Sequence, residues 1–218
     1  MIAAAPIVRH EIVLGRSELG RPIVAWESGD PHAKRRLLVV GCIHGNEPAG
    51  IAIADALTRA AVPAGLDVWV VPDLNPDGVA AGTRQDARAV DLNRNFPWMW
   101  RPLTGVFSSG PRPLSERESR IGFNLIRRIR PTISIWFHQH LDVVDESGGD
   151  LQVERTFARQ VGMRTERLTR YPGSVVNWQN HTFPGTTSFV VELPAGRVPA
   201  ARVGVFTRAI LRLRTARS

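Results

Sequence analysis

Four continuous runs of mainly apolar residues constrain the fold of this chain more than any other feature. They cover residues 35–41, 66–72, 132–140 and 187–194, and the first two read RRLLVVG and LDVWVVP. A strand with one solvated face alternates apolar and polar residues, whereas an unbroken apolar run is typical of a strand that is covered on both faces. We therefore expect these runs to be the core strands of a largely parallel sheet.

Helical patterns alternate with these runs. Apolar residues recur at helical spacing in segments 47–61, 113–131, 150–162 and 201–216. Alternation of strands and helices is typical of a sheet with helices packed on both sides. The sequence predicts a single α/β domain over residues 1–218, with a mostly parallel mixed β-sheet flanked by helices on both faces.

Two local patterns add detail to this prediction. Segments 10–15 and 21–28 flank a short polar turn, which favours an antiparallel hairpin. In segment 113–131, Ser115 followed three residues later by Glu118 fits a capping box at the start of a helix.

Charge and composition indicate which classes of binding partner to expect. The net charge is +8, but the 28 basic residues are spread along the chain, which favours a solvated surface over a nucleic-acid footprint. We expect no nucleic-acid partner, although the charge would favour an anionic substrate or cell-wall polymer. No stretch approaches the roughly 18–20 apolar residues of a membrane span. Residues 1–10 do not resemble an intact signal peptide, so we expect a cytoplasmic protein. An exported form stays open, because removal of a signal peptide would leave the same sequence.

Polar side chains lie at or near the carboxyl ends of three of the apolar runs. His44 and Glu47 come directly after the first run, His138 ends TISIWFH, and Glu192 ends TSFVVE. One histidine at a strand end is usually structural, but sites in open α/β sheets gather at the carboxyl ends of strands. Two histidines and a glutamate are the ligand set of a catalytic zinc site with an open fourth position. The pattern predicts one Zn²⁺ per chain, with Glu192 free to act as a base.

Several motifs occur together and in a fixed order: GCIHGNEPAG, NPDG, VDLNRNFP, WFHQH and FVVELP. In this order they resemble the zinc carboxypeptidase family, over roughly residues 8–194. The short chain and the segments GTRQDARAVDLNRNFP and GPRPLSERES look most like its murein peptide amidase branch. That branch hydrolyses the bond between γ-D-glutamate and meso-diaminopimelate, so the resemblance implies a small cell-wall-derived peptide as substrate and leaves the oligomeric state open.

The resemblance implies the roles of the predicted metal ligands and base. His44, Glu47 and His138 match the zinc ligands, and Glu192 matches the general base. The sequence HQH offers His140 as a second ligand choice. We favour His138, which directly follows TISIWF, and assign His140 to the substrate wall or to the surroundings of the ligands.

The resemblance also implies substrate-binding residues in the irregular segment 73–105. Arg84 would polarise the scissile carbonyl, with nearby Arg88 as its rival. Asn93 and Arg94 match the pair that grips a substrate carboxylate, for which a guanidinium offers two parallel hydrogen bonds.

One feature of the family has no obvious match. Tyr171 is the only tyrosine, and it lies too early in the chain to correspond to the lid tyrosine of the carboxypeptidases. His181 or Trp178 would fill that region instead, which makes His181 a candidate substrate-binding residue.

Two other functions remain open. N-acyl amino acid deacylases of the aspartoacylase or succinylglutamate desuccinylase type also resemble HGNE and DLNR, but NPDG and the short chain speak against them. A zinc-free cell-wall binding module on a degenerate peptidase scaffold is disfavoured by the complete ligand set.

Overall fold

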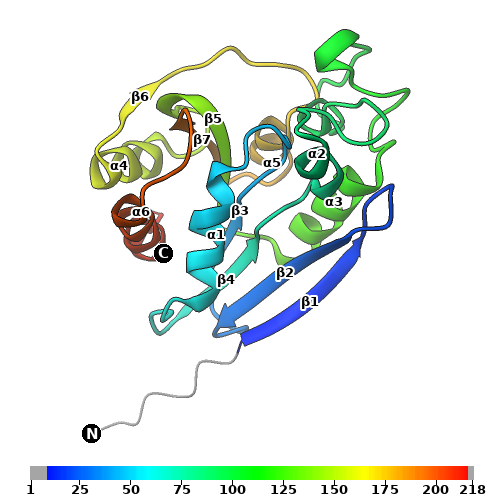
Figure 1. Cartoon of the computed structure of the whole chain (residues 1–218). Helices are drawn as coiled ribbons and strands as arrows, with labels where there is room; N and C mark the ends of the chain where they lie inside the picture. Colours follow the sequence, from blue (N-terminus) through cyan, green and yellow to red (C-terminus); the bar gives the residue numbers. More distant parts are fainter. Residues whose placement is uncertain (1–8, 216–218) are drawn as a thin grey trace, which may run out of the picture.

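The computed structural model describes residues 9–215 (Figure 1). Residue 216 of the predicted helix 201–216 and residues 1–8 of the N-terminal segment considered for a signal peptide lie outside the described residues. Within the described residues this helix ends at Arg212, earlier than predicted. The strands are β1 (Arg9–Arg16), β2 (Pro22–Gly29), β3 (Arg35–Val40), β4 (Leu66–Val71), β5 (Ile133–Asp145), β6 (Arg164–Glu166) and β7 (Thr187–Pro194). The helices are α1 (Ala49–Arg59), α2 (Pro76–Ala81), α3 (Arg117–Ile129), α4 (Leu151–Val161), α5 (Val175–Thr182) and α6 (Ala200–Arg212), with 3₁₀ turns η1 (Leu92–Arg94) and η2 (Gly105–Phe107).

All of these strands belong to one mixed sheet. Its order is β1-β2-β4-β3-β5-β6, and β7 pairs with β5. β1 and β2 form the predicted antiparallel hairpin, and β2 is also antiparallel to β4. The remaining pairs, β3 with β4 and β5 with β3, β6 and β7, are parallel. The predicted mostly parallel mixed sheet is confirmed.

The two faces of the sheet are each covered by helices, as Figure 1 shows. On β3, Leu37 and Val39 pack into a core with residues of α1, α4 and α6. Leu38 and Val40 point the other way, into a core with residues of α3 and α5. Because alternate side chains enter opposite cores, the strand needs an apolar residue at every position.

The start of α3 differs from the prediction. The residue at the N-cap is Glu116, and no side chain caps the helix, so the capping box is wrong. Ser115 Oγ instead accepts a hydrogen bond from Asn95 Nδ2 and donates one to Glu116 Oε1. Glu118 accepts the backbone N–H of Glu18. Tertiary partners therefore take both side chains that the local pattern assigned to the cap.

Three parts of the structure had no counterpart in the sequence prediction. The segment 73–105 is not wholly irregular, since it contains α2 and η1 and reaches the start of η2. β6 is short, and α5 has a weak apolar pattern, with Ser174 capping it by accepting the N–H of Asn177.

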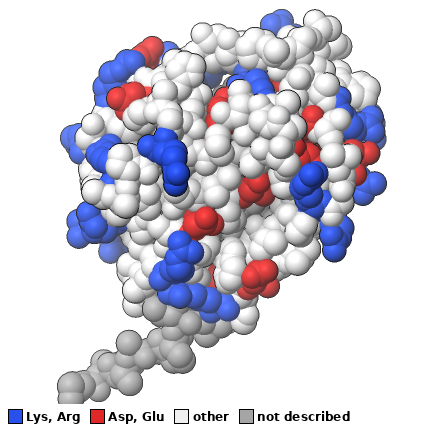
Figure 2. All heavy atoms as spheres, viewed as in Figure 1, with Lys and Arg blue, Asp and Glu red and all other residues white. Residues whose placement is uncertain are grey.

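Charges on the described surface are mixed. In the face shown in Figure 2, basic side chains are spread over the molecule with acidic ones between them. The absence of a nucleic-acid partner stays a prediction. Across residues 9–215, no helix combines the length and the apolar character that a bilayer crossing requires.

Candidate metal centre and substrate cavity

The loop between β3 and α1 carries two of the predicted ligands. Glu47 N donates to His44 O at 2.9 Å, so a tight turn turns both side chains to one side. A Cβ on Gly45 would lie 1.9 Å from the carbonyl carbon of Gly78, so the loop lies directly against α2. Asn75 Nδ2 donates to Ile43 O at 3.1 Å and supports the loop from the NPDG motif. The glycine and the asparagine thus serve to position the ligands.

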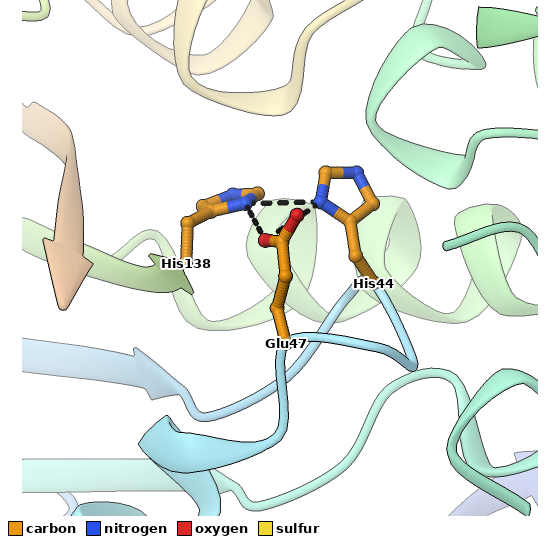
Figure 3. A group of neighbouring side chains, drawn as sticks. All are labelled: His44, Glu47 and His138. Carbon is orange, nitrogen blue, oxygen red and sulfur yellow. Dashed lines mark hydrogen bonds and ion pairs between the residues drawn. The ribbon is translucent and has the colours of Figure 1, made fainter. Parts of the chain in front are cut away.

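His44 and Glu47, which follow β3, meet His138 from the middle of β5 (Figure 3). The prediction that His138 ends its strand is wrong, because β5 continues to Asp145. Glu47 Oε2 lies 3.0 Å from His44 Nδ1 and 2.9 Å from His138 Nδ1, and the two Nδ1 atoms are 3.0 Å apart. A tetrahedral zinc ion with bonds of about 2.0–2.1 Å places neighbouring ligand atoms roughly 3.3 Å apart. The three donor atoms therefore have the separations of one face of such a site.

The charge of this group also suits a cation. Burial alone would raise the pKa of Glu47, but hydrogen bonds from His138 and His44 hold the pKa well below the usual range of a carboxyl. Among the described residues, these three are the one group of histidine, cysteine or acidic side chains whose ligand atoms converge, all within 4.8 Å. The donor set fits a zinc ion.

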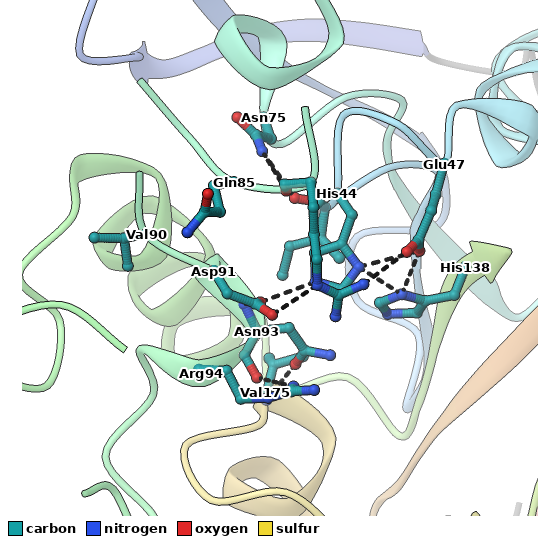
Figure 4. A network of polar contacts seen from close by, with 12 residues as sticks. His44, Glu47, Asn75, Gln85, Val90, Asp91, Asn93, Arg94, His138 and Val175 are labelled. Carbon is teal, nitrogen blue, oxygen red and sulfur yellow. Dashed lines mark hydrogen bonds and ion pairs between the residues drawn. The ribbon is translucent and has the colours of Figure 1, made fainter. Parts of the chain in front are cut away.

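Asp91 supports the group from behind, a role that the sequence analysis missed (Figure 4). Its Oδ1 lies 2.9 Å from His44 Nε2 and accepts the N–H of Asn93 at 2.9 Å. Arg84 Nε donates to its Oδ2 at 2.9 Å. Burial would raise the pKa of Asp91, but His44 and the neighbouring arginines hold it well below the usual range. A metal-binding histidine usually donates its second N–H to a carboxylate, and the aspartate of DLNR was the signal for this contact.

Glu192 stands directly beside the ligand group. It lies opposite His138 in the register of β7 and β5, on neighbouring strands about 4.8 Å apart. Its Oε2 is buried and has no hydrogen-bond partner among the described residues. Glu192 and all three ligand residues line one cavity of about 330 Å³, a volume in the range of small-molecule sites.

The structure brings Arg84 to this cavity and leaves Arg88 outside it. Arg84 Nη1 donates to Glu47 Oε1 at 2.8 Å, and the side chain lines the cavity. Arg88 Nε instead lies 3.1 Å from Glu116 Oε2, and its side chain is half exposed. The geometry favours Arg84 over its rival.

Asn93 and Arg94 both line the cavity. Asn93 Oδ1 accepts the N–H of Val175 at 3.0 Å, which ties the loop to the start of α5 (Figure 4). Arg94 is buried, donates from Nη1 to Asn93 O at 2.7 Å, and lies with its guanidinium carbon 4.3 Å from the ring centre of Tyr171. Tyr171 lines the cavity as well, a position that the sequence analysis did not assign to it.

The two remaining histidines have different positions. His140 lines the cavity, next to Gln139 and Leu141. His181 is exposed on α5, stacks on Trp98 and is not among the cavity-lining residues. Trp178 is buried against other aromatic rings. Neither His181 nor Trp178 is among the residues that line the cavity.

Comparisons with known proteins agree with this geometry. A family model described as zinc carboxypeptidase matches residues 1–167. Murein peptide amidase A of Escherichia coli K12 is 31% identical over 179 residues, which cover 75% of this chain and 74% of that protein. The crystal structure of the murein-tripeptide amidase of Escherichia coli O157 has a TM-score of 0.75 at 25% identity and covers 98% of this chain and 95% of its own. Carboxypeptidase A of Helicoverpa armigera also has a TM-score of 0.75, at 19% identity over 98% of this chain and 70% of its own, which concerns the fold alone. The resemblance predicted from the motifs is confirmed, and the chain belongs to the zinc carboxypeptidase family of hydrolytic enzymes.

Proposed function

We propose that this chain is a zinc-dependent amidase that hydrolyses the bond between γ-D-glutamate and meso-diaminopimelate in small murein peptides. One observation carries the proposal: the ligand atoms of His44, Glu47 and His138 converge within 4.8 Å on the wall of a cavity that Glu192 also lines. The murein peptide amidases to which the chain is similar support the choice of substrate.

The three ligand residues would hold one Zn²⁺ per chain. When bound there, zinc supplies Lewis acidity and lowers the pKa of a coordinated water to about 7. His44 is oriented for this role by Asp91, and the anionic Glu47 lies against both imidazoles. Removal of any one ligand leaves two, too few for a tetrahedral site with an open position.

The side chains around the ligands carry the proton and the charge. Glu192, which lies opposite His138 and lines the same cavity, takes a proton from the attacking water and delivers it to the leaving amine. Arg84 still has N–H groups beyond those bonded to Asp91 and Glu47, and these stabilise the oxygen of the scissile carbonyl as it becomes negative. Such a donor is worth about 3–4 kcal/mol in a dry site.

Asn93 and Arg94 orient the substrate. In this proposal Arg94 binds the carboxylate that is attached to the leaving amine, because it lines the cavity and its guanidinium has N–H groups beyond the one bonded to Asn93 O. Tyr171 covers the guanidinium at 4.3 Å and Asn93 O fixes one of its nitrogens. The guanidinium is therefore held in place before the substrate arrives, which reduces the entropy lost on binding.

A hydrolysis panel tests the proposed function. Zinc-loaded protein is incubated with L-Ala-γ-D-Glu-meso-diaminopimelate and, separately, with N-acetylaspartate and N-succinylglutamate. We expect cleavage of the tripeptide alone, loss of cleavage after chelation, and recovery after zinc is restored. Cleavage of the N-acyl amino acids without cleavage of the tripeptide would assign the chain to the deacylases instead.

A further inference from the structure

A second charged pair lines the same cavity and has no part in the hydrolysis proposed above. Asp145 ends β5, Arg170 precedes α5, and Arg170 Nη1 lies 2.5 Å from Asp145 Oδ2. The side chain of Asp145 is 3% exposed and that of Arg170 is 29% exposed. Both residues line the cavity that His138 and Glu192 line. The pair therefore faces whatever occupies the cavity.

The course of β5 sets the distance between this pair and Glu192. Beyond the ligand-bearing part of the strand, Val143 again lies opposite Glu192. Ser147 Oγ accepts the N–H of Val190 at 3.2 Å and donates to Asp145 Oδ2 at 2.6 Å. Val190 and Glu192 are two residues apart on β7, so their side chains face the same side, roughly 7 Å apart. Asp145 thus lies about one strand repeat from Glu192.

The hydrogen bonds of the pair leave room for a ligand. The carboxylate of Asp145 accepts from Leu168 N at 2.9 Å, from Ser147 and from Arg170, which leaves about one further acceptor position. Arg170 also donates to Glu146 O, and its guanidinium has N–H groups beyond these two bonds. The pair therefore offers both an acceptor and donors to a bound molecule.

The occupant must match both charges. An apolar side chain would exclude water from the pair without replacing its hydrogen bonds, which costs free energy. A single ammonium group would match Asp145 only. The nearby cavity wall includes Val176 and Val190, which suits a short methylene chain leading toward the pair.

We propose that Asp145 and Arg170 select a substrate residue whose side chain ends in both an ammonium and a carboxylate group. The inference rests on the proposed function, in which meso-diaminopimelate provides the leaving amine. Its side-chain methylenes separate the two α-carbons by roughly 5 Å, comparable with the distance from Glu192 to Asp145. Asp145 accepts from the distal ammonium, and Arg170 donates to the distal carboxylate.

Three peptides that differ only at the last residue test this inference. They are L-Ala-γ-D-Glu-X, in which X is meso-diaminopimelate, L-lysine or L-norleucine, and kcat/KM is measured for each. The parent should prefer them in that order. Arg170→Met should lower kcat/KM for the diaminopimelate peptide by about tenfold to a hundredfold, the value of a hydrogen bond to a charged group, and should leave the lysine peptide within about threefold.

Asp145→Asn tests the other half of the pair. It should lower kcat/KM for the diaminopimelate and lysine peptides alike and leave the norleucine peptide unchanged or improved. Asp145 is buried, so the substitution could unfold the protein. The melting temperature of the Asp145→Asn variant and its activity on the norleucine peptide show whether it is folded. Arg155→Met is the matched control, since Arg155 pairs with Glu146 on the exposed surface outside the cavity. It should behave as the parent.

The outcomes separate the inference from the proposed function. If the parent cleaves none of the three peptides, the proposed function fails and this inference fails with it. If the parent prefers the diaminopimelate peptide and Arg170→Met keeps the same preference over lysine, the proposed function stands and the pair does not select the substrate. An Asp145→Asn variant that loses all three peptides equally while remaining folded would also overturn the selective role.

Discussion

Replacing Asp91 by asparagine should weaken zinc binding without removing any ligand. Asp91 makes contacts of 2.9 Å with His44 Nε2, Asn93 N and Arg84 Nε, all of which are donors when His44 binds a metal through Nδ1. An amide has one oxygen and one NH₂ group, so either orientation of the asparagine places a donor against a donor. Loss of the charge-assisted hydrogen bond to His44 should cost about 1.5–3 kcal/mol. This corresponds to a decrease of roughly 10- to 100-fold in zinc affinity.

Competition with a chromophoric zinc chelator measures this change. Asp67→Asn is the matched control, because Asp67 is also buried and also bonded, to Trp69 Nε1, but lies near the start of β4, away from the carboxyl ends of the strands. It should leave the zinc dissociation constant unchanged. An Asp91→Asn variant that binds zinc within about twofold of the parent would refute the reasoning that Asp91 orients the ligand, since such outer contacts typically matter by tenfold or more.

Three further predictions address the base, the anchor and the pH dependence of stability. The Glu192→Gln variant should bind zinc as the parent does, but its kcat should fall by a factor of about 10²–10⁴. A kcat within a few-fold of the parent value would show that Glu192 has a structural role and is not the base. Arg94→Lys and amidation of the substrate carboxylates should each lower kcat/KM strongly, but the two effects should not add, because both remove the same contact. If the combined loss is the full product of the two single losses, Arg94 does not bind the substrate carboxylate. Burial raises the pKa of Glu154 to about 7, so the folded state retains a proton that the unfolded state releases. The free energy of unfolding should therefore fall as the pH rises from the usual carboxyl range to about 7. Urea titrations at several pH values should show a smaller fall for Glu154→Gln. If the free energy of unfolding of the variant depends on pH as strongly as that of the parent, Glu154 is not the group responsible.

The core of the fold and the meeting of His44, Glu47 and His138 could be predicted because each depends on short-range patterns. A strand buried on both faces needs an unbroken apolar run, as in Leu37 to Val40, and the polar residues that end such runs mark one edge of the sheet. His138 was preferred to His140 on this basis, and the structure gives His138 the contacts with Glu47.

The rest depended on loops whose paths the local sequence does not determine. Tyr171 reaches the cavity because the segment before α5 lies over Arg94, and no periodic pattern encodes that path. His181 was placed by its type and approximate position, but it stacks on Trp98 outside the cavity. The capping box at Ser115 had the right spacing, yet a distant asparagine bonds to its hydroxyl group instead. In each case a tertiary contact outweighed the local signal.

Hydrolysis of the murein tripeptide in H₂¹⁸O tests the central claim most directly. Mass spectrometry of the products should find one ¹⁸O atom in L-Ala-D-Glu, in the new γ-carboxylate, and none in free meso-diaminopimelate, because water supplies the oxygen to the acyl side of the cleaved bond. Zinc-loaded Glu192→Gln should give almost no labelled product in the same time. Label in free L-alanine would show that another bond is cleaved, and an intact tripeptide after incubation with the zinc-loaded parent would contradict the proposed function.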